Sequence, residues 1–288
     1  MPIIGNTDIL RFVRAANTNF YYAFLFLPRE KREAIFAAYA FSRRTDDLVD
    51  DAVSPEEART SLAAWRRELD ACYNGTPADP VALGLQRVLR RFPIRRTHFD
   101  LLVDGVEMDL TMRRYETFDE LYQYCYRVAS AVGLICIEIF GYRSPEAEDY
   151  AINLGIAVQL TNILRDISED AAKDRIYLPT EDMERFHYTE TDLFNGVYNQ
   201  RFTDLMQFEC NRARAYYEKA RRLLPEADRN RLCAAEIMGG IYARLLEQIE
   251  RSNYNVFEKR AQLSSLSKII IAVRALLANR VNVVGRHA

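Results

Sequence analysis

Glycine and proline are scarce in this sequence, with 11 glycines and 9 prolines among 288 residues. A sheet protein of this length needs many turns, and so few turn-forming residues supply too few positions for them. The sequence also lacks any sustained alternation of apolar and polar residues at period two. Apolar residues recur instead at helical spacing, as at Ile237, Ile241 and Leu245. We therefore predict an all-α fold.

Cysteine and histidine are also few and scattered. The five cysteines lie at positions 72, 125, 136, 210 and 233, without CxxC spacing, and the three histidines lie at 98, 187 and 287. An odd number of unclustered cysteines disfavours a disulfide framework and favours a reducing compartment. A structural zinc site is disfavoured for the same reason, because no pair of cysteines or histidines has ligand spacing.

No sign of charge dominates, and long hydrophobic runs are missing. The sequence has 39 Lys and Arg against 41 Asp and Glu, a net charge of −2. It therefore lacks the basic excess of a typical nucleic-acid-binding protein. The longest apolar candidate, AVGLICIEIFG at 131–141, is interrupted by Glu138 and is shorter than the roughly 18 residues of a membrane-spanning helix. The start, MPIIGNTDILRF, lacks the pattern of a signal peptide. We expect a cytoplasmic protein, with a peripheral membrane contact as the alternative.

The few turn signals divide the sequence into roughly eight or more helices. They lie at Pro28, NGTPADP (74–80), Phe92-Pro93, GYRSPE (141–146), YLPTED (177–182) and Pro225. Ser54-Pro55-Glu56-Glu57 is typical of a helix start, with proline at the first helical position and acids in the first turn. No linker or internal repeat divides the sequence, so we predict one domain over 1–288 with a substantial core.

The stretch TNILRDISEDAAKDRIYLP (161–179) places an amide and two carboxylates on one side of a helix. At about 100° per residue, Asp166 lies about 40° and Asp170 about 80° from Asn162. The apolar residues fill a separate sector: Ile156, Leu160, Ile163, Leu164 and Ile167. Like charges at i,i+4 destabilise a helix by roughly 0.2–0.5 kcal/mol, and the only basic residue in the turn, Arg165, lies off this strip. A plain solvated face would more often mix the signs.

A second segment, AAYAFSRRTDDLVDD (37–51), repeats the arrangement. It carries Asp46 and Asp50 at i,i+4, with Tyr39 and Arg43 on the same side of the helix. Mg²⁺ takes oxygen ligands and is commonly held by one or two carboxylates together with substrate phosphates. Arginine offers a planar fork for phosphate oxygens. Two acidic pairs with companion arginines therefore predict a magnesium–diphosphate site between facing helices.

These segments resemble the squalene/phytoene synthase family. DDLVD (46–50) is similar to the first aspartate-rich motif of that family, and QLTNILRDISED followed by RIYLP is similar to its second. The resemblance extends to FYYAFLFLP, to YCYRVASAVG (124–133) and to the IYARLLEQI region ending in SNYNVFEKR. It covers nearly the whole chain in the family's order. It implies a single-domain, isoprenoid-synthase-type helical bundle with a central cavity.

The resemblance also implies a role for individual residues. Asp46, Asp50, Asn162, Asp166 and Asp170 match the family's magnesium ligands. Asn17, Tyr39, Arg43, Gln159, Arg165, Arg175 and Tyr242 match positions that hold the diphosphates or line the entrance, with Arg43 also counted as catalytic. Family members often carry serine near Asn17, so that match is weak. Tyr124 matches a tyrosine that handles the proton in the first half-reaction. The small residues Ala129, Ala131 and Gly133 match a segment that lines the isoprenoid tunnel.

The implied reaction is a Mg²⁺-dependent, head-to-head condensation of two prenyl diphosphates, with more than one ion in the site. We expect two farnesyl diphosphates to give presqualene diphosphate in a squalene or hopanoid pathway, since the chain looks most like bacterial presqualene diphosphate synthases. The alternative is a phytoene or dehydrosqualene synthase of a carotenoid pathway, with geranylgeranyl diphosphate as the C20 substrate. No GxGxxG motif is present, so NADPH is not expected. Enzymes later in the pathway are expected partners.

Two other functions remain open. Some relatives keep this fold without catalysis, as assembly or binding proteins, but acids at both motifs argue against that alternative. A head-to-tail prenyl elongase would also carry DDxxD, but not the second motif found here. The C-terminal segment SKIIIAVRALLANRVNVVGR (267–286) has apolar positions at 269, 270, 273, 276 and 277. We expect it to be a helix packed on the domain, with an interfacial role as the alternative.

Overall fold

The computed structural model describes residues 19–284, and side chains from 22 to 277. Within this range the chain forms helices and no strand, which confirms the predicted all-α class. The helices are α2 (Asn19–Phe24), α3 (Arg29–Asp50), α4 (Pro55–Asn74), α5 (Pro80–Leu89), α6 (Arg96–Met108), α7 (Phe118–Cys125), the π-helix η1 (Tyr126–Ser130), α8 (Ala131–Phe140), α9 (Glu146–Ala172), α10 (Thr180–Arg185), α11 (Glu190–Phe194), α12 (Gln200–Leu223), α13 (Cys233–Arg251) and α14 (Ser265–Val284).

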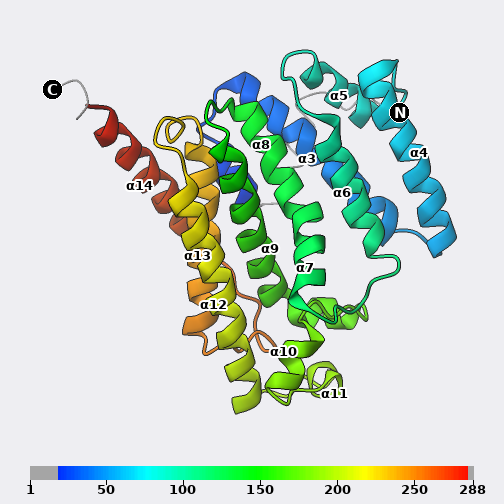
Figure 1. The fold of residues 1–288 in the computed structure, drawn as a ribbon, viewed down its shortest axis with the longest axis vertical. Helices are drawn as coiled ribbons and strands as arrows, with labels where there is room; N and C mark the ends of the chain where they lie inside the picture. Colours follow the sequence, from blue (N-terminus) through cyan, green and yellow to red (C-terminus); the bar gives the residue numbers. More distant parts are fainter. Residues whose placement is uncertain (1–18, 285–288) are drawn as a thin grey trace.

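Helix α9 is the centre of the bundle (Figure 1), and it packs against α7, η1, α8, α11, α12 and α13. Its apolar sector is buried as predicted: Ile156, Leu160, Ile163, Leu164 and Ile167. Helices α4 and α5 lie at one edge of the molecule and α14 lies at the other. The polar strip of α9 faces away from most of this packing, toward the space between α9 and α3.

The predicted helix breaks are confirmed, and the caps show why they occur where they do. Ser54 accepts a hydrogen bond from the Glu57 backbone N–H at the start of α4, with Pro55 at the first helical position. Helix α8 ends at Gly141, whose φ of +74° few other residues adopt easily. The sequence analysis did not predict the loops at 109–117 and 252–264. Both loops contribute residues to the site described below.

One continuous helical segment, Phe118–Phe140, is long and apolar enough to cross a membrane by length and composition, although half of its most apolar window is buried. It comprises α7, η1 and α8, and it runs through the interior of the bundle. The π-helix inserts an extra residue into the turn, a feature often found at functional sites. Side chains from this segment, including Tyr124, Val128 and Cys136, line the central cavity. We therefore interpret it as a core helix.

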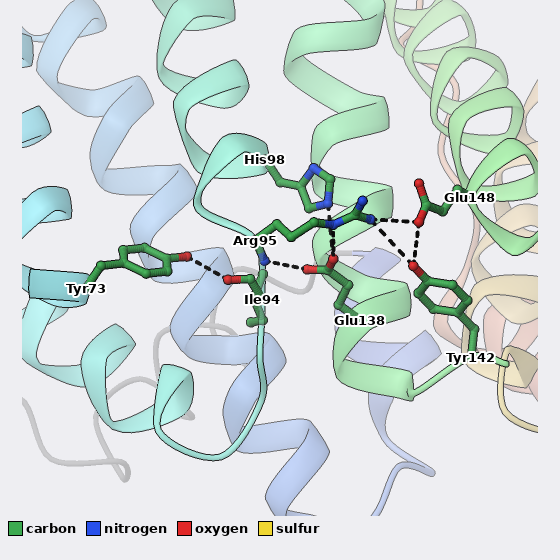
Figure 2. Close-up of polar contacts among 7 residues, drawn as sticks. All are labelled: Tyr73, Ile94, Arg95, His98, Glu138, Tyr142 and Glu148. Atoms are coloured by element: carbon green, nitrogen blue, oxygen red, sulfur yellow. Dashed lines mark hydrogen bonds and ion pairs between the residues drawn. The ribbon is translucent and has the colours of Figure 1, made fainter. Parts of the chain in front are cut away.

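A partly exposed ionic network joins α6, α8 and α9 (Figure 2). Glu138 on α8 accepts hydrogen bonds from the Arg95 backbone N–H at 2.8 Å and from Arg95 Nε at 2.5 Å. The Arg95 guanidinium also contacts Glu148 at 2.8 Å, and Tyr142 donates to the same carboxylate at 2.6 Å. His98 lies 3.3 Å from Glu138. Glu138, which interrupts the apolar run in the sequence, thus holds together three helices that line the cavity.

The predicted C-terminal helix packed on the domain is confirmed, since α14 forms and packs against α13 and α2. Its inward face consists of Lys268, Ile271, Ala272, Ala275 and Leu276. Of the apolar positions noted in the sequence, Ile269, Ile270, Val273 and Leu277 are exposed and only Leu276 packs inward. Helical periodicity identifies an apolar face, but it cannot tell which of two apolar faces packs on the domain.

Candidate active site

The two acidic strips face one cavity of about 390 Å³. Its walls come from α3, α6, the α7–α8 segment, α9 and the loop after α9. The structure brings most of the predicted residues to this cavity: Tyr39, Arg43, Asp46, Asp50, Tyr124, Gln159, Asn162, Asp166, Asp170 and Arg175 line it. Arg165 and Tyr242 do not line it; Arg165 is bonded to Asp166 of the cavity wall and interacts electrostatically with Tyr242. Asn17 lies outside the described residues.

On α3, the residues of the first strip fall on one stripe because their positions differ by three or four. Burial raises the pKa of the Asp46 carboxyl to about 7, with the nearby Asp50 and Asp109 adding to the effect of burial. Arg43 opposes this shift but forms its ion pair with Asp47, at 2.8 Å. Its guanidinium therefore reaches the cavity without neutralising either acid of the predicted pair.

On α9, the acids of the second strip have opposite electrostatic environments. Burial raises the pKa of Asp170 to about 7, and the Asp166 charge adds to this shift. Burial acts the same way on Asp166, but hydrogen bonds from Arg165 and Arg260 outweigh it and lower its pKa. Arg165 Nε and Arg260 Nε each lie 2.7 Å from Asp166 Oδ1. Asp166 is therefore neutralised by arginine, whereas Asp170 is not.

The donor set fits magnesium. In the described part of the chain, no three acidic, histidine or cysteine side chains converge closely enough to enclose a metal ion by themselves. The carboxylates instead stand on opposite walls, as expected for an ion that completes its shell with water and diphosphate oxygens. The Asn162 Oδ1 atom is buried without a hydrogen-bond partner. An unpaired oxygen of this kind, beside carboxylates whose pKa is raised, leaves room for a hard cation to bind.

The loop after α9 places two cationic side chains beside Asp50, on the α3 wall of the cavity. Arg175 lies 3.3 Å from Asp50, and Lys173 lies 3.4 Å from the same carboxylate. The loop is held in place because the Ile176 backbone N–H donates to the Arg113 carbonyl at 2.9 Å. The RIYLP sequence therefore returns the chain from the end of α9 to the end of α3, which places cations between the two strips.

Tyr124 is part of a hydrogen-bonded triad that the sequence analysis missed. Its hydroxyl donates to Asp109 Oδ2 at 3.3 Å and lies 3.3 Å from the Tyr177 hydroxyl. Tyr177 donates to Asp109 Oδ1 at 2.9 Å. Burial raises the pKa of Asp109, although Arg175 and the two hydroxyls oppose the shift. Burial also raises the pKa of both tyrosines. A carboxylate and two phenols thus share protons at the cavity wall.

Four residues that the sequence analysis did not place in the site therefore contribute to it: Asp109, Lys173, Tyr177 and Arg260. Tyr177 stands in the RIYLP part of the second motif, and Lys173 lies between its two quoted parts, so the sequence gave a signal for both. Asp109 and Arg260 stand in unpredicted loops, where helical periodicity gives none.

An apolar cavity of about 130 Å³ continues from the acidic one. The two share Phe24, Val128, Val132 and Cys136, and the second extends along Ala129, Gly133 and Ile137. Ala129 and Gly133 were predicted to line an isoprenoid tunnel, and the structure places them in this wall. Ala131, from the same prediction, is fully buried in the core instead. The site as a whole has a charged end and an apolar end.

Comparisons with known proteins agree with this geometry. The squalene/phytoene synthase family model matches residues 13–267. A 15-cis-phytoene synthase from Synechococcus elongatus is 41% identical over 273 residues, which cover 90% of this chain and 88% of the relative. A phytoene synthase from Mycobacterium tuberculosis is 39% identical over 270 residues, with coverage of 92% and 88%.

Solved structures give the same assignment. A dehydrosqualene synthase in complex with ligand superposes with a TM-score of 0.86 at 29% identity, and 96% of each chain is covered. A squalene synthase, HpnC from Alicyclobacillus acidocaldarius, superposes with a TM-score of 0.78 at 28% identity, covering 87% of this chain and 94% of the other. On the family match and these relatives, the chain belongs to the squalene/phytoene synthase family.

Proposed function

We propose that this protein is a phytoene synthase, which condenses two geranylgeranyl diphosphates head to head. Family membership supports prenyl transfer in general. The C20 substrate is supported by relatives described as phytoene synthases at 38–41% identity. The relatives do not support the first expectation, presqualene diphosphate from two C15 substrates. That expectation rested on overall look rather than on a diagnostic residue, and the carotenoid alternative now fits better.

The observation that carries the proposal is the division of one cavity into a charged end and an apolar end. Asp46, Asp50, Asp166 and Asp170 stand at the charged end, and the walls of α8 and η1 continue it as an apolar channel. A prenyl diphosphate has the same division, with an anionic head and a hydrocarbon tail. A non-catalytic protein that only binds a prenyl diphosphate would need no more than this match between the cavity and the ligand. Asp46 and Asp170, which lack an arginine partner among the described residues and have raised pKa values, add a cation requirement that simple binding of an anion does not explain.

The residues of the charged end would bind and orient the substrate heads. Asp46, Asp50, Asn162, Asp166 and Asp170 would hold magnesium, which when bound neutralises the diphosphate and makes it a better leaving group. Arg43 and Arg175 point guanidinium groups into the same space and can bind phosphate oxygens in pairs. The apolar wall excludes water from the allylic cation that forms when the C–O bond to diphosphate breaks.

Tyr124 and its hydrogen-bond partners are the candidates to accept the proton that the reaction releases. The second substrate adds its C2–C3 double bond to the cation, and closure of the cyclopropane releases one proton. The Tyr124 hydroxyl can accept that proton only as it passes its own proton on, and Asp109 is bonded to it for this purpose. The released diphosphate is the other candidate base. Substitutions of Tyr124 and Asp109 separate the two.

The test is incubation of purified protein with Mg²⁺ and labelled C15 or C20 diphosphate, with and without NADPH, followed by product identification. We expect phytoene from the C20 substrate, no need for NADPH, and loss of turnover with EDTA. Asp166→Asn should be inactive, whereas Asp51→Asn, at the exposed end of α3, should be active. If only the C15 substrate were turned over efficiently, the proposal of a phytoene synthase would be wrong and a squalene-type product would take its place. No product from either substrate would favour the non-catalytic alternative.

A further inference from the structure

Helix α14 presents a second apolar face to solvent, which we call the α14 ridge. Its residues are between 41% and 67% exposed: Leu266, Ile269, Ile270, Val273 and Leu277. On a helix at about 100° per residue they fall within about 100° of the circumference. Single exposed apolar side chains are common, but a continuous stripe of five large ones marks an interaction surface.

The ridge is not needed for packing α14 on the domain. The opposite side of the helix already does this, with Ala272 fully buried and Ile271 in contact with Gly240 of α13. At the N-terminal end, the Tyr22 hydroxyl of α2 donates to Ser265 Oγ at 2.8 Å. A surface helix of a globular protein normally has one apolar face. Helix α14 has two, and it lies at the outer edge of the bundle (Figure 1).

A groove of about 530 Å³ adjoins the ridge. Leu276, next to Ile269 on the helix surface, lines it together with Phe26 and Leu27 of the α2–α3 loop. Phe26 is itself 46% exposed, and it extends the apolar surface from α14 onto this loop. The apolar area therefore includes both a convex helix face and the adjacent groove.

Cations line the same groove. Lys31, Arg143 and Arg231 contribute to its wall. Lys31 and Arg231 donate to the carbonyls of Phe140 and Gly141, at 2.6 Å and 3.2 Å, so both are fixed at the end of α8. Arg143 is exposed, and within the described residues no carboxylate pairs with its guanidinium. Arg274 lies on the exposed flank of the ridge.

The sequence around α14 is basic although the whole chain is not. Residues 259–288 contain no Asp or Glu but six Lys or Arg: Lys259, Arg260, Lys268, Arg274, Arg280 and Arg286. The whole chain has a net charge of −2. An apolar helix face flanked by cations is typical of segments that lie in the interface of an anionic bilayer.

We propose that the α14 ridge and the cationic groove beside it form the surface by which this protein docks on an anionic lipid bilayer. The ridge enters the boundary between headgroups and acyl chains, while Arg143, Lys31 and Arg231 face the lipid phosphates. A second copy of the chain fits less well, because a two-fold interface would bring each cationic groove against its own copy. The proposal gains its purpose from the proposed function, whose substrate and product are lipids, but its observations are independent of it.

The test is co-sedimentation of the full chain with vesicles of phosphatidylcholine alone or with phosphatidylglycerol. We expect at least 10-fold more binding to the anionic vesicles, weakened by added salt. The double substitution Ile270→Ser with Val273→Ser should abolish binding, and Arg143→Gln should reduce it several-fold. Val53→Ser and Arg59→Gln are matched controls on the α4 side, and binding should be unchanged. All four variants should turn over detergent-dispersed substrate like the wild type. Asp46→Asn should bind vesicles normally, which separates this result from failure of the proposed function.

A second measurement identifies what covers the ridge. Trp65, the only native tryptophan, is buried, so Ile270→Trp reports on the ridge itself. We expect emission typical of a water-exposed indole in buffer and a blue shift with anionic vesicles. A blue-shifted emission in buffer would overturn the proposal, because another part of the chain or a second copy would then cover the ridge. Equal vesicle binding by the wild type and the Ile270/Val273 variant would also overturn it.

Discussion

The Tyr124 hydroxyl donates a hydrogen bond to the Asp109 carboxylate at 3.3 Å, from one wall of the cavity to another. Tyr124 comes from the end of α7, two residues before the π-helix begins, and Asp109 follows the last turn of α6. Both are held by Tyr177, whose hydroxyl donates to Asp109 at 2.9 Å. The arrangement gives the phenol a fixed orientation and a proton acceptor. Neither follows from the motif that contains Tyr124.

The first prediction concerns this pair. Tyr124→Phe should leave Mg²⁺ dependence and substrate affinity intact and reduce turnover by roughly 10²–10⁴, the usual contribution of a positioned acid–base group. Asp109→Asn should show a loss of the same size in kcat, with KM little changed. Remaining product should shift toward prenyl alcohols, because a cation that cannot proceed is captured by water.

Tyr217→Phe is the matched control for that prediction. Tyr217 is a buried phenol that shares a hydrogen bond with Thr161 at 2.9 Å and does not line the cavity. Its loss should cost about 1 kcal/mol of stability without the change in product. Wild-type rates in Tyr124→Phe, together with an unchanged product, would make the released diphosphate the base.

The second prediction is a pH dependence of the metal-free protein. The pKa of Asp46 is about 7 in the fold, against 3.8 for the free side chain, so the folded state binds more protons between these values. Its contribution to stability is therefore greatest at low pH and is lost as pH rises through 7. Asp46→Asn should be more stable than the wild type above pH 7, by on the order of 1–3 kcal/mol, and the difference should shrink toward pH 4.

Urea unfolding at pH 5 and pH 8 measures this effect in the presence of EDTA. Mg²⁺ with inorganic diphosphate should stabilise the wild type at pH 8, because ligands that bind only the folded state add stability. The Asn variant should gain less. A variant that is less stable than the wild type at pH 8 without metal would contradict the assignment of Asp46 as a half-buried acid without an ion-pair partner among the described residues.

The third prediction concerns Arg260, which pairs with Asp166 at 2.7 Å and with Glu169 at 3.1 Å. This arginine neutralises Asp166, and we expect it to turn to the substrate diphosphate once magnesium binds Asp166. Arg260→Gln should raise KM by roughly 10–100-fold, since a charge-assisted hydrogen bond contributes about 1.5–3 kcal/mol. Steady-state kinetics at saturating Mg²⁺ measure it. Arg214→Gln, which breaks an ion pair with Glu250, is the control and should leave KM unchanged.

Residues on helices could be placed by periodicity, and residues in loops could not. Helical periodicity fixes the angle between side chains, so Asp166 and Asp170 fell on one strip and the structure puts both in the cavity. Arg175, in the loop after α9, was placed only by the resemblance of RIYLP to the family's motif. Asp109 and Arg260 follow helix ends that no proline or glycine marks, so periodicity could not place them, although Arg260 ends the quoted segment SNYNVFEKR. Their catalytic and ligand roles, like those of the predicted residues, stay predictions until the substitutions are measured.

Periodicity also leaves open which face of α14 packs on the domain. A period of 3.6 residues identified apolar positions, but two apolar faces satisfy it. Which face packs depends on the shape of α13 and α2, where Gly240 leaves space for Ile271. Tertiary packing decides that choice, and a single helix carries no information about it. The structure leaves Ile269 and Val273 on the exposed side.

The last prediction concerns the close contact between α9 and the π-helix. A β-carbon on Gly155 would lie 2.6 Å from Ser130 Cα and 2.7 Å from Ser130 N, both of which are backbone atoms that cannot rotate away. Gly155→Ala should therefore force the two helices apart. Overpacking of this kind costs roughly 1–3 kcal/mol, more than the gain of up to about 1 kcal/mol from higher helix propensity. The midpoint of urea unfolding should fall.

Gly84→Ala in α5 is the matched substitution of opposite sign. A β-carbon there meets no heavy atom within 4 Å, so only the propensity gain remains, and stability should rise by about 0.5–1 kcal/mol. Turnover also distinguishes the Gly155 variant from the Gly84 variant. Gly155→Ala should also lower turnover, because the π-helix it displaces begins two residues after Tyr124, whereas Gly84→Ala should leave turnover at the wild-type value. If Gly155→Ala proved as stable and active as Gly84→Ala, the contact between α9 and the π-helix would not be a constraint on the site.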